Sequence, residues 1–179
     1  KSTKEYWKSR WDRIVVDDEM FSENDYPLKY AIKTIVDKDK SLYILEAGCG
    51  NGRILRYFHN RQFNIDGFDY IETAINKLKK VDSSLSLSVN NIMNTGLSDN
   101  SYDYILAFGL FHNFEFNDVK LALKETNRIL KNNGKICLSF RSDNIQNFLN
   151  DFFKNPIKNK QFHKLNLNEI EFRSLLKDH

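Results

Sequence analysis

Five short apolar segments punctuate the middle of the 179-residue chain. They are rich in β-branched and aromatic residues, and several lack polar alternation, as expected for strands buried on both faces of a parallel sheet. The five predicted strands are residues 42–47, 63–68, 85–89, 102–108 and 135–140. Helical patterns separate them, including an apolar stripe made by Ile71, Ala74, Ile75 and Leu78. Alternating strands and helices predict an α/β fold with a doubly wound, mainly parallel sheet and helices on both faces.

The two ends of the chain carry helical patterns outside this alternation. Residues 4–36 are predicted to be helical, with Trp7 and Trp11 one turn apart on a shared face. A second stripe over 119–130 predicts a helix with Asn117 as its N-cap, followed by a turn at 131–134. Capping-box spacing predicts a short amphipathic helix over 166–176, after an exposed loop at 154–160. We therefore expect one domain, with an N-terminal helical segment (1–40) and a sheet domain (41–179).

Composition excludes several classes of protein. A hydrophobic fraction of 41% suits one globular domain. The net charge is only +3, from 27 basic and 24 acidic residues, so we expect no nucleic acid as partner. We also expect no membrane partner, because no apolar run reaches the roughly 20 residues that span a bilayer. The polar N-terminus is no secretory signal, and Cys49 and Cys137 resemble reduced cysteines, so we predict a cytoplasmic protein.

Three glycines follow the first predicted strand, at Gly48, Gly50 and Gly52, directly behind Glu46. In doubly wound sheets, ligands bind beyond the carboxyl ends of the strands, and a glycine-rich turn lets backbone approach them. The G-x-G-x-x-G fingerprint of dinucleotide-binding proteins is one residue longer, which argues against a nicotinamide enzyme. Asp69 ends the second strand, where a carboxylate can accept both hydroxyls of a ribose. These residues predict a nucleoside site.

The same residues resemble the class I S-adenosylmethionine-dependent methyltransferases, which have a Rossmann-like fold. The segment 46–52 matches the E/D-x-G-x-G-x-G motif of that family, and Asp69 matches its ribose-binding acid. Residues 98–105 are similar to the segment leading into the fourth strand. Residues 130–135 are similar to the L-K-P-G-G turn, with Asn132 and Asn133 in place of the proline and the first glycine. The resemblance covers residues 41–141 and implies S-adenosylmethionine as cofactor, with no metal.

The resemblance also implies a role for each matching residue. The backbone of Gly48 and Gly50 faces the methionine part, and Glu46 organises the loop and the cofactor's amino group. Tyr70 and Ile71 lie against the adenine ring, Asn91 and Ile92 near its amino group, and Phe108 beside the sulfonium. The predicted cofactor-binding set is Glu46, Gly48, Cys49, Gly50, Gly52, Asp69, Tyr70, Ile71, Asn91, Ile92 and Phe108. Cys49 is predicted to be small and buried, without a catalytic role.

Several of these residues have a structural alternative. Asp69 is also placed to cap the following helix, and Tyr70 to pack at its start. Arg53 either reaches the methionine carboxylate or stays in solvent. Methyl transfer needs alignment, desolvation and, for some acceptors, a base. His112, just beyond the fourth strand, is the candidate base or orienting group, and packing of its loop is the alternative. Tyr6, Trp7 and Trp11 are candidates for a substrate-side lid, and simple docking of an amphipathic helix is their alternative.

The resembled family closes its sheet with a sixth and a seventh strand, and this sequence stops after the helix that ordinarily precedes them, so we expect either a truncated sequence or a fold without these strands. Without these last two strands the fifth strand would be an edge, which predicts instability, an unusual cover, or pairing with a second copy in a homodimer. We predict an enzyme that transfers a methyl group to an O, N or S atom of a small-molecule acceptor. A non-catalytic S-adenosylmethionine-binding partner subunit, or a methyltransferase acting on protein or RNA, is the alternative.

Overall fold

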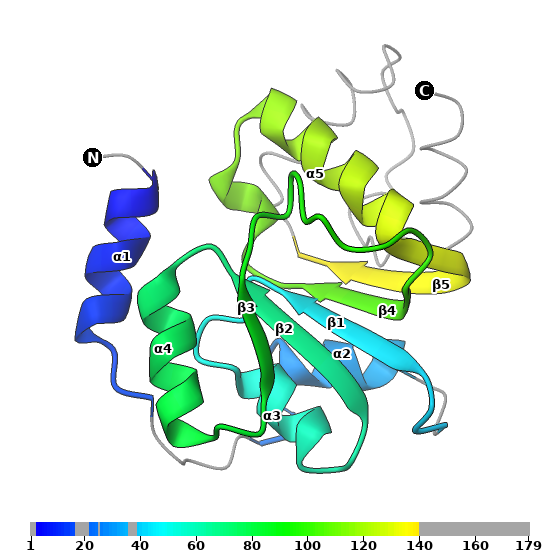
Figure 1. Cartoon of the computed structure of the whole chain (residues 1–179), viewed down its shortest axis with the longest axis horizontal. Helices are drawn as coiled ribbons and strands as arrows, with labels where there is room; N and C mark the ends of the chain where they lie inside the picture. Colours follow the sequence, from blue (N-terminus) through cyan, green and yellow to red (C-terminus); the bar gives the residue numbers. More distant parts are fainter. Residues whose placement is uncertain (1–2, 17–21, 25, 36–38, 140–179) are drawn as a thin grey trace.

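The computed structural model describes residues 3–16, 22–24, 26–35 and 39–139 (Figure 1). Five strands, five α-helices and one short 3-10 turn lie in this part of the chain. In chain order they are α1 (Thr3–Arg13), α2 (Leu28–Thr34), β1 (Tyr43–Ala47), α3 (Arg53–His59), β2 (Asn64–Asp69), α4 (Glu72–Val81), β3 (Ser86–Val89), β4 (Tyr102–Ala107), η1 (Phe111–Asn113), α5 (Phe116–Ile129) and β5 (Leu130–Leu138). The predicted helix at 166–176, the loop at 154–160 and Phe140 lie outside the described residues.

The five strands form one parallel sheet in the order β3-β2-β1-β4-β5, which confirms the predicted fold class. The chain moves outward from β1 to β3, then returns to the other side of β1 and moves outward again to β5. The strand order therefore reverses between β1 and β4, where ligands bind in such sheets. Among the described residues β5 pairs only with β4. Pairing of β5 with a second copy stays a prediction.

The fifth strand begins earlier than predicted. It starts at Leu130, which pairs with Tyr102, and regular pairing resumes only at Lys135 opposite Tyr104. The predicted turn at 131–134 is therefore an irregularity within the strand, opposite a single residue of β4. Asn133 has a φ of 66°, a left-handed conformation that asparagine adopts more easily than most residues.

Two helix predictions were wrong in detail. The N-cap position of α5 is Glu115, in an extended conformation and without a side-chain cap bond, and not Asn117, which lies within the first turn. Residues 4–36 were predicted to be helical, but the structure has two helices there, and the described residues 14–16, 22–24 and 26–27 lie outside both. Pro27 disfavours helical backbone in the residue before it and lacks the N–H that a helix interior needs, so α2 begins only at Leu28.

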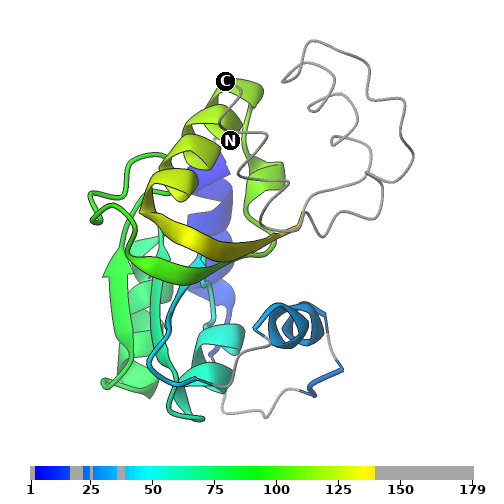
Figure 2. The ribbon, with the colours of Figure 1, turned by 90° about the vertical axis from the view of Figure 1, so that its right-hand side faces the viewer.

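Two hydrophobic cores cover the two faces of the sheet, as the doubly wound prediction requires. One contains the buried side chains of α2, α3 and α4, and the other those of α5. Figure 2 shows the sheet from its side, with α5 on one face and α2 and α3 on the other. Within the described part of the chain, no helix has the length and apolar character that crossing a membrane requires.

Candidate active site

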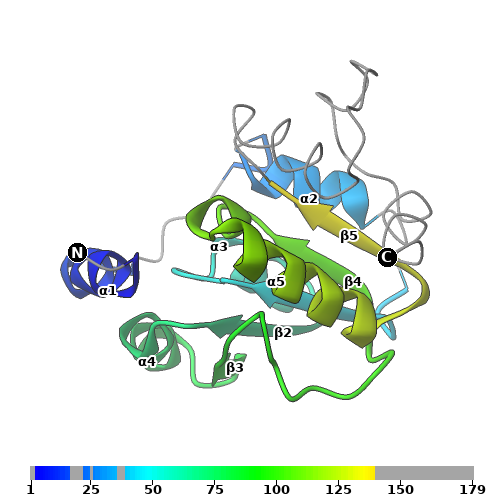
Figure 3. The same ribbon diagram turned by 90° about the horizontal axis from the view of Figure 1, so that it is seen from above.

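The candidate site lies at the carboxyl ends of β1, β2 and β4, around the point of strand reversal. Three loops meet there: the glycine loop 48–52 after β1, the turn 70–71 after β2, and residues 108–110 after β4. Helix α1 lies alongside α4 next to this edge, as Figures 1 and 3 both show. The N-terminal segment is thus placed beside the glycine loop.

The glycine loop is folded tightly over the end of β2. The N–H groups of Gly48 and Cys49 both donate to the carbonyl oxygen of Phe68, at N···O distances of 2.8 and 2.9 Å. Gly48, Gly50 and Gly52 have φ values of 70°, 52° and 70°. L-residues pay a steric penalty there, so the three glycines are required by the course of the backbone.

Asp69 joins the glycine loop to the turn after β2. Its Oδ2 accepts the N–H of Gly50 and its Oδ1 accepts the N–H of Ile71, both at 2.9 Å. The side chain is buried, which raises the pKa of Asp69, while the N–H groups of Ile71, Gly50 and Tyr70 act in the opposite direction. Helix α4 has Ile71 as its N-cap without a side-chain cap bond, so Asp69 does not act as the N-cap residue.

Glu46 is a second buried acid beneath the loop. Its Oε2 accepts the N–H of Leu55 at 2.8 Å, which ties β1 to the first turn of α3. Burial raises the pKa of Glu46 to about 8; the bond from Leu55 opposes this, and the nearby charge of Asp69 adds to it. Burial also raises the pKa of the Cys49 thiol well above its usual value, so Cys49 is a protonated packing residue at neutral pH.

Apolar side chains from three other elements lie against the glycines. A Cβ built on Gly48 would meet Cδ1 of Leu110 at 3.1 Å, and one on Gly52 would meet Cδ2 of Leu78 at 2.8 Å. A Cβ on Gly50 would lie only 2.6 Å from Cζ2 of Trp11. The indole of α1 therefore rests directly on the middle glycine of the motif.

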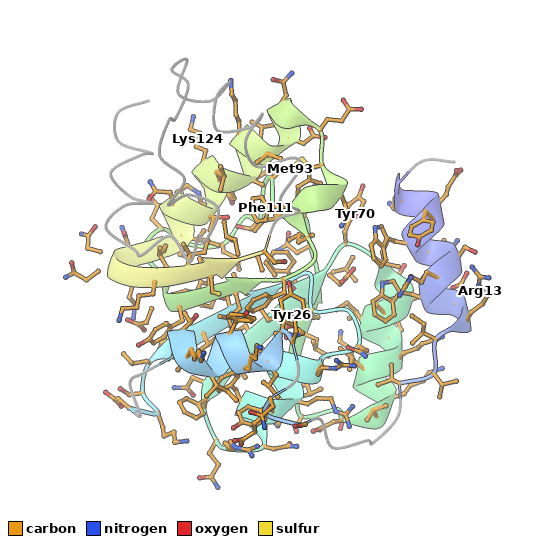
Figure 4. The ribbon with its side chains drawn as sticks, turned by 180° about the vertical axis from the view of Figure 1, so that it is seen from behind. Arg13, Tyr26, Tyr70, Met93, Phe111 and Lys124 are labelled. Carbon is orange, nitrogen blue, oxygen red and sulfur yellow. The ribbon has the colours of Figure 1, made fainter. Side chains whose placement is uncertain are left out.

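The turn after β2 has one exposed and one buried side chain. Tyr70 is 47% exposed, and Lys4 of α1 places its Nζ 4.4 Å from the centre of the Tyr70 ring. In Figure 4 Tyr70 is labelled between α5 and α1. Ile71 is buried. An exposed aromatic ring beside a buried aliphatic side chain is suited to stacking on a planar base.

The segment after β3 is fixed by hydrogen bonds. Asn91 accepts the N–H of Met93 on its Oδ1 at 2.9 Å, and Ile92 is buried in the core under α5. Further along, Glu125 of α5 accepts both the N–H and the hydroxyl of Thr95, at 2.7 and 2.6 Å. Asn91 and Ile92 are thereby held near the carboxyl end of β3, next to β2.

Comparison with known proteins shows which family this chain belongs to. Residues 45–138, more than half of the chain, match the family described as Methyltransferase domain. The chain belongs to the class I S-adenosylmethionine-dependent methyltransferases. Its predicted family and fold class are therefore confirmed, and the cofactor that this membership implies is S-adenosylmethionine.

The methyltransferase domain is similar to proteins of several organisms. It is 34% identical over 125 residues to the ubiquinone/menaquinone biosynthesis C-methyltransferase UbiE of Rickettsia prowazekii, covering 62% of this chain and 49% of that protein. It is 29% identical over 131 residues to an uncharacterised protein of Methanocaldococcus jannaschii, covering 70% of this chain and 55% of that one. The chain thus spans about half the length of these curated relatives.

Solved structures share the fold of the methyltransferase domain. A TehB-like SAM-dependent methyltransferase from Corynebacterium glutamicum superposes with a TM-score of 0.63 at 21% sequence identity. The match covers 82% of this chain and 78% of that one. At this identity the likeness supports the fold alone.

Residues 108–113 and α1 are the segments predicted to lie on the substrate side. Phe108 packs edge-to-face on Tyr26, with ring centres 6.1 Å apart and planes at 83°. Asn113 donates from Nδ2 to the carbonyl oxygens of Gly109 and Leu110, which closes the loop after β4. The backbone of His112 lies in η1, while its side chain is outside the described part of the structure.

The structure brings most of the predicted residues to one edge of the sheet. Trp11 reaches the glycine loop, whereas Tyr6 is 50% exposed and contacts Trp7 edge-to-face within α1. Sequence reasoning missed two residues that contact this region: Tyr26, which packs on Phe108, and Lys77, whose Nζ donates to the carbonyl oxygen of Trp11. Tyr26 lies in a polar segment, and Lys77 lies on the polar side of a helical stripe, so neither carried a signal.

Proposed function

We propose that this chain transfers the methyl group of S-adenosylmethionine to an O, N or S atom of a small-molecule acceptor. The observation that carries the proposal is the position of Asp69. Its Oδ2 accepts the N–H of Gly50 and its Oδ1 accepts the N–H of Ile71, and a carboxylate has about four acceptor positions in all. A buried carboxylate at the end of β2 with acceptor capacity on both oxygens suits the two adjacent hydroxyls of a ribose.

The remaining residues suit the other parts of the cofactor. Gly48 and Gly50 offer bare backbone for the methionine part, and Cys49 and Gly52 keep the loop in shape. Glu46 would accept a hydrogen bond from the cofactor's amino group. The adenine would lie among Tyr70, Ile71, Asn91 and Ile92, and Phe108 would present an aromatic ring to the sulfonium, a cation–π contact.

The cofactor supplies an already activated methyl group, so this chain has mainly to align, desolvate and, where needed, accept a proton. His112 is the proposed proton acceptor or orienting group for the acceptor. Residues 1–40 are proposed to close the site, with Tyr6, Trp7 and Trp11 on the substrate side. A relative named for ubiquinone/menaquinone biosynthesis supports a small-molecule acceptor.

Titration with S-adenosylhomocysteine tests the cofactor assignment. Asp69→Ala should weaken binding by about 1–3 kcal/mol, or about 5- to 150-fold, for each ribose hydroxyl left without its acceptor. The control is Asp82→Ala, an acid that follows the far end of α4 and should bind like the unmodified protein. Equal affinity for Asp69→Ala would remove Asp69 from the site, and binding of NADH in place of S-adenosylhomocysteine would refute the cofactor.

Turnover tests the catalytic half of the proposal. S-adenosylhomocysteine release is measured from S-adenosylmethionine with panels of O, N, S and C acceptors, and with peptide and RNA substrates. The proposal expects turnover with a small molecule, and loss of turnover with retained cofactor binding in His112→Ala. Binding without turnover on every panel would favour the non-catalytic partner subunit.

A further inference from the structure

The C-terminal end of α1 is held by one side chain of α4. Nζ of Lys77 donates to the carbonyl oxygens of Trp11 at 2.5 Å, Asp12 at 3.0 Å and Ile14 at 2.7 Å. The last carbonyls of a helix have no partners within the helix, and they carry the negative end of its dipole. An ammonium group has three N–H donors, and here each has its own carbonyl. Lys77 therefore satisfies the end of a helix to which it does not belong.

The same contact involves a residue that lies against the glycine loop. Lys77 binds the main chain of Trp11, and the indole of Trp11 rests on Gly50, where a Cβ would lie 2.6 Å from Cζ2 and 2.7 Å from Cη2. The Gly50 N–H is in turn bonded to Asp69. A continuous chain of contacts thus runs from Lys77 through Trp11 and Gly50 to the proposed ribose-binding acid.

We propose that Lys77 is a positioning residue of the cofactor site: it docks the end of α1 so that the Trp11 indole forms a wall on the glycine loop. Docking of α1 and binding of the cofactor are then coupled. A bound nucleoside gains the indole wall only when α1 is docked, so it must favour docking by the same factor. This inference rests on the proposed function for its ligand, although docking itself does not depend on any ligand.

Lys77 has little part in holding α4 itself. That helix is anchored by Ala74, Ile75 and Leu78, which are all fully buried against the sheet. The hydrogen bonds of the Lys77 ammonium all lead to the main chain of residues 11–14. Removing the ammonium should release α1 and leave the sheet domain folded.

The chain offers a direct reporter of this docking. It contains two tryptophans, Trp7 and Trp11, and both lie on α1. Intrinsic tryptophan fluorescence therefore reports on α1 alone. In the absence of ligand, Lys77→Met should red-shift the emission and increase quenching by acrylamide, while far-UV circular dichroism and the unfolding midpoint stay close to those of the unmodified protein.

Affinity for S-adenosylhomocysteine tests the coupling. Lys77→Met should weaken binding roughly tenfold through faster dissociation, since charge-assisted bonds that position Trp11 are lost. Lys77→Arg, which keeps the charge and the donors, should recover part of the affinity. Lys80→Met removes an exposed lysine from the same helix and should change neither fluorescence nor affinity.

A double variant decides whether Lys77 acts through the indole. In a Trp11→Ala background, Lys77→Met should have almost no further effect on affinity, whereas full additivity would overturn the proposal. Unchanged fluorescence in Lys77→Met would also overturn it, even if the variant proved less stable. Failure of the unmodified protein to bind S-adenosylhomocysteine would instead refute the proposed function. The fluorescence of Lys77→Met without ligand would still show whether Lys77 docks α1.

Discussion

The glycine loop and helix α1 meet at Gly50, yet they are held in place in different ways. The loop is fixed by backbone hydrogen bonds to the Phe68 carbonyl oxygen and to the buried carboxylate of Asp69. Helix α1 is attached through side chains that reach it from α4 and from the turn after β2. The first region is thus set by the fold of the sheet, and the second by a few side-chain contacts, each of which a single substitution can remove. We call the glycine loop 48–52 and Asp69 the cradle, and the Trp11 indole on α1 the wall. We infer that the cradle is fixed by the fold, whereas the wall can be detached from it.

The largest effect should come from the residue next to Lys77. Leu78 is fully buried and lies under Gly52, so Leu78→Ala should lower the free energy of unfolding by about 2–5 kcal/mol. Lys77→Met should change it by about 1 kcal/mol or less. Denaturant unfolding followed by circular dichroism checks both values. Val81→Ala, at a 38% exposed position of the same helix, is the control. If Lys77→Met and Leu78→Ala lowered the free energy of unfolding equally, Lys77 would be part of the folded core and not only an attachment of α1.

The second effect concerns the pH dependence of the cradle. With a pKa of about 8, the Glu46 carboxyl is mostly protonated in the empty protein at pH 7. In the proposed site the cofactor's ammonium group would stabilise the Glu46 carboxylate, so binding should expel this proton. Raising the pH removes the competing proton, and affinity should therefore rise up to about tenfold per pH unit between about pH 6 and 8, then level off.

Calorimetry in buffers of different ionisation enthalpy measures that proton directly. The unmodified protein should release close to one proton on binding S-adenosylhomocysteine at neutral pH, and Glu46→Gln should release almost none. Asp82→Asn is the control, since its carboxyl lies at the far end of α4. The same proton release in Glu46→Gln would show that another group is responsible.

These contrasts also explain what the sequence could and could not reveal. The three glycines and Asp69 determine the conformation of their own loop and its hydrogen bonds to the neighbouring strand. A short sequence pattern was therefore enough to predict most of the cofactor-binding loop. Helix α4 could be predicted from the sequence because Ala74, Ile75 and Leu78 lie on one face of the helix. The contact between Lys77 and the end of α1 joins distant segments, and the packing of Tyr26 on Phe108 does the same. A periodic pattern does not reveal which distant segment a polar residue contacts. The sequence therefore left two alternatives for α1, a substrate-side lid or a simply docked helix.

The junction of the two regions can be broken at Gly50 itself. Gly50→Ala places a methyl group into the Trp11 ring and also puts alanine at a φ of 52°. The backbone strain alone should cost about 1–2 kcal/mol. Gly96→Ala is a matched control, because it has a φ of 66° with no atom within 4 Å of its Cβ. Loss of S-adenosylhomocysteine affinity and a red-shifted tryptophan emission should occur at position 50 and not at 96. Identical behaviour of the two variants would mean that the indole contact contributes nothing.

The smallest effect should come from the other end of α1. Lys4 lies over the Tyr70 ring, and an exposed cation–π contact contributes about 0.5–1 kcal/mol. Lys4→Gln should therefore weaken docking of α1, and with it S-adenosylhomocysteine binding, about two- to fivefold. Tyr70→Leu should have a larger effect, because it also removes the ring proposed to lie against adenine. Lys8→Gln, an exposed lysine of the same helix, controls for charge. If Lys4→Gln shifts tryptophan emission as far as Lys77→Met does, both ends fasten α1 equally; an unchanged emission would leave Lys77 as the principal attachment of the wall.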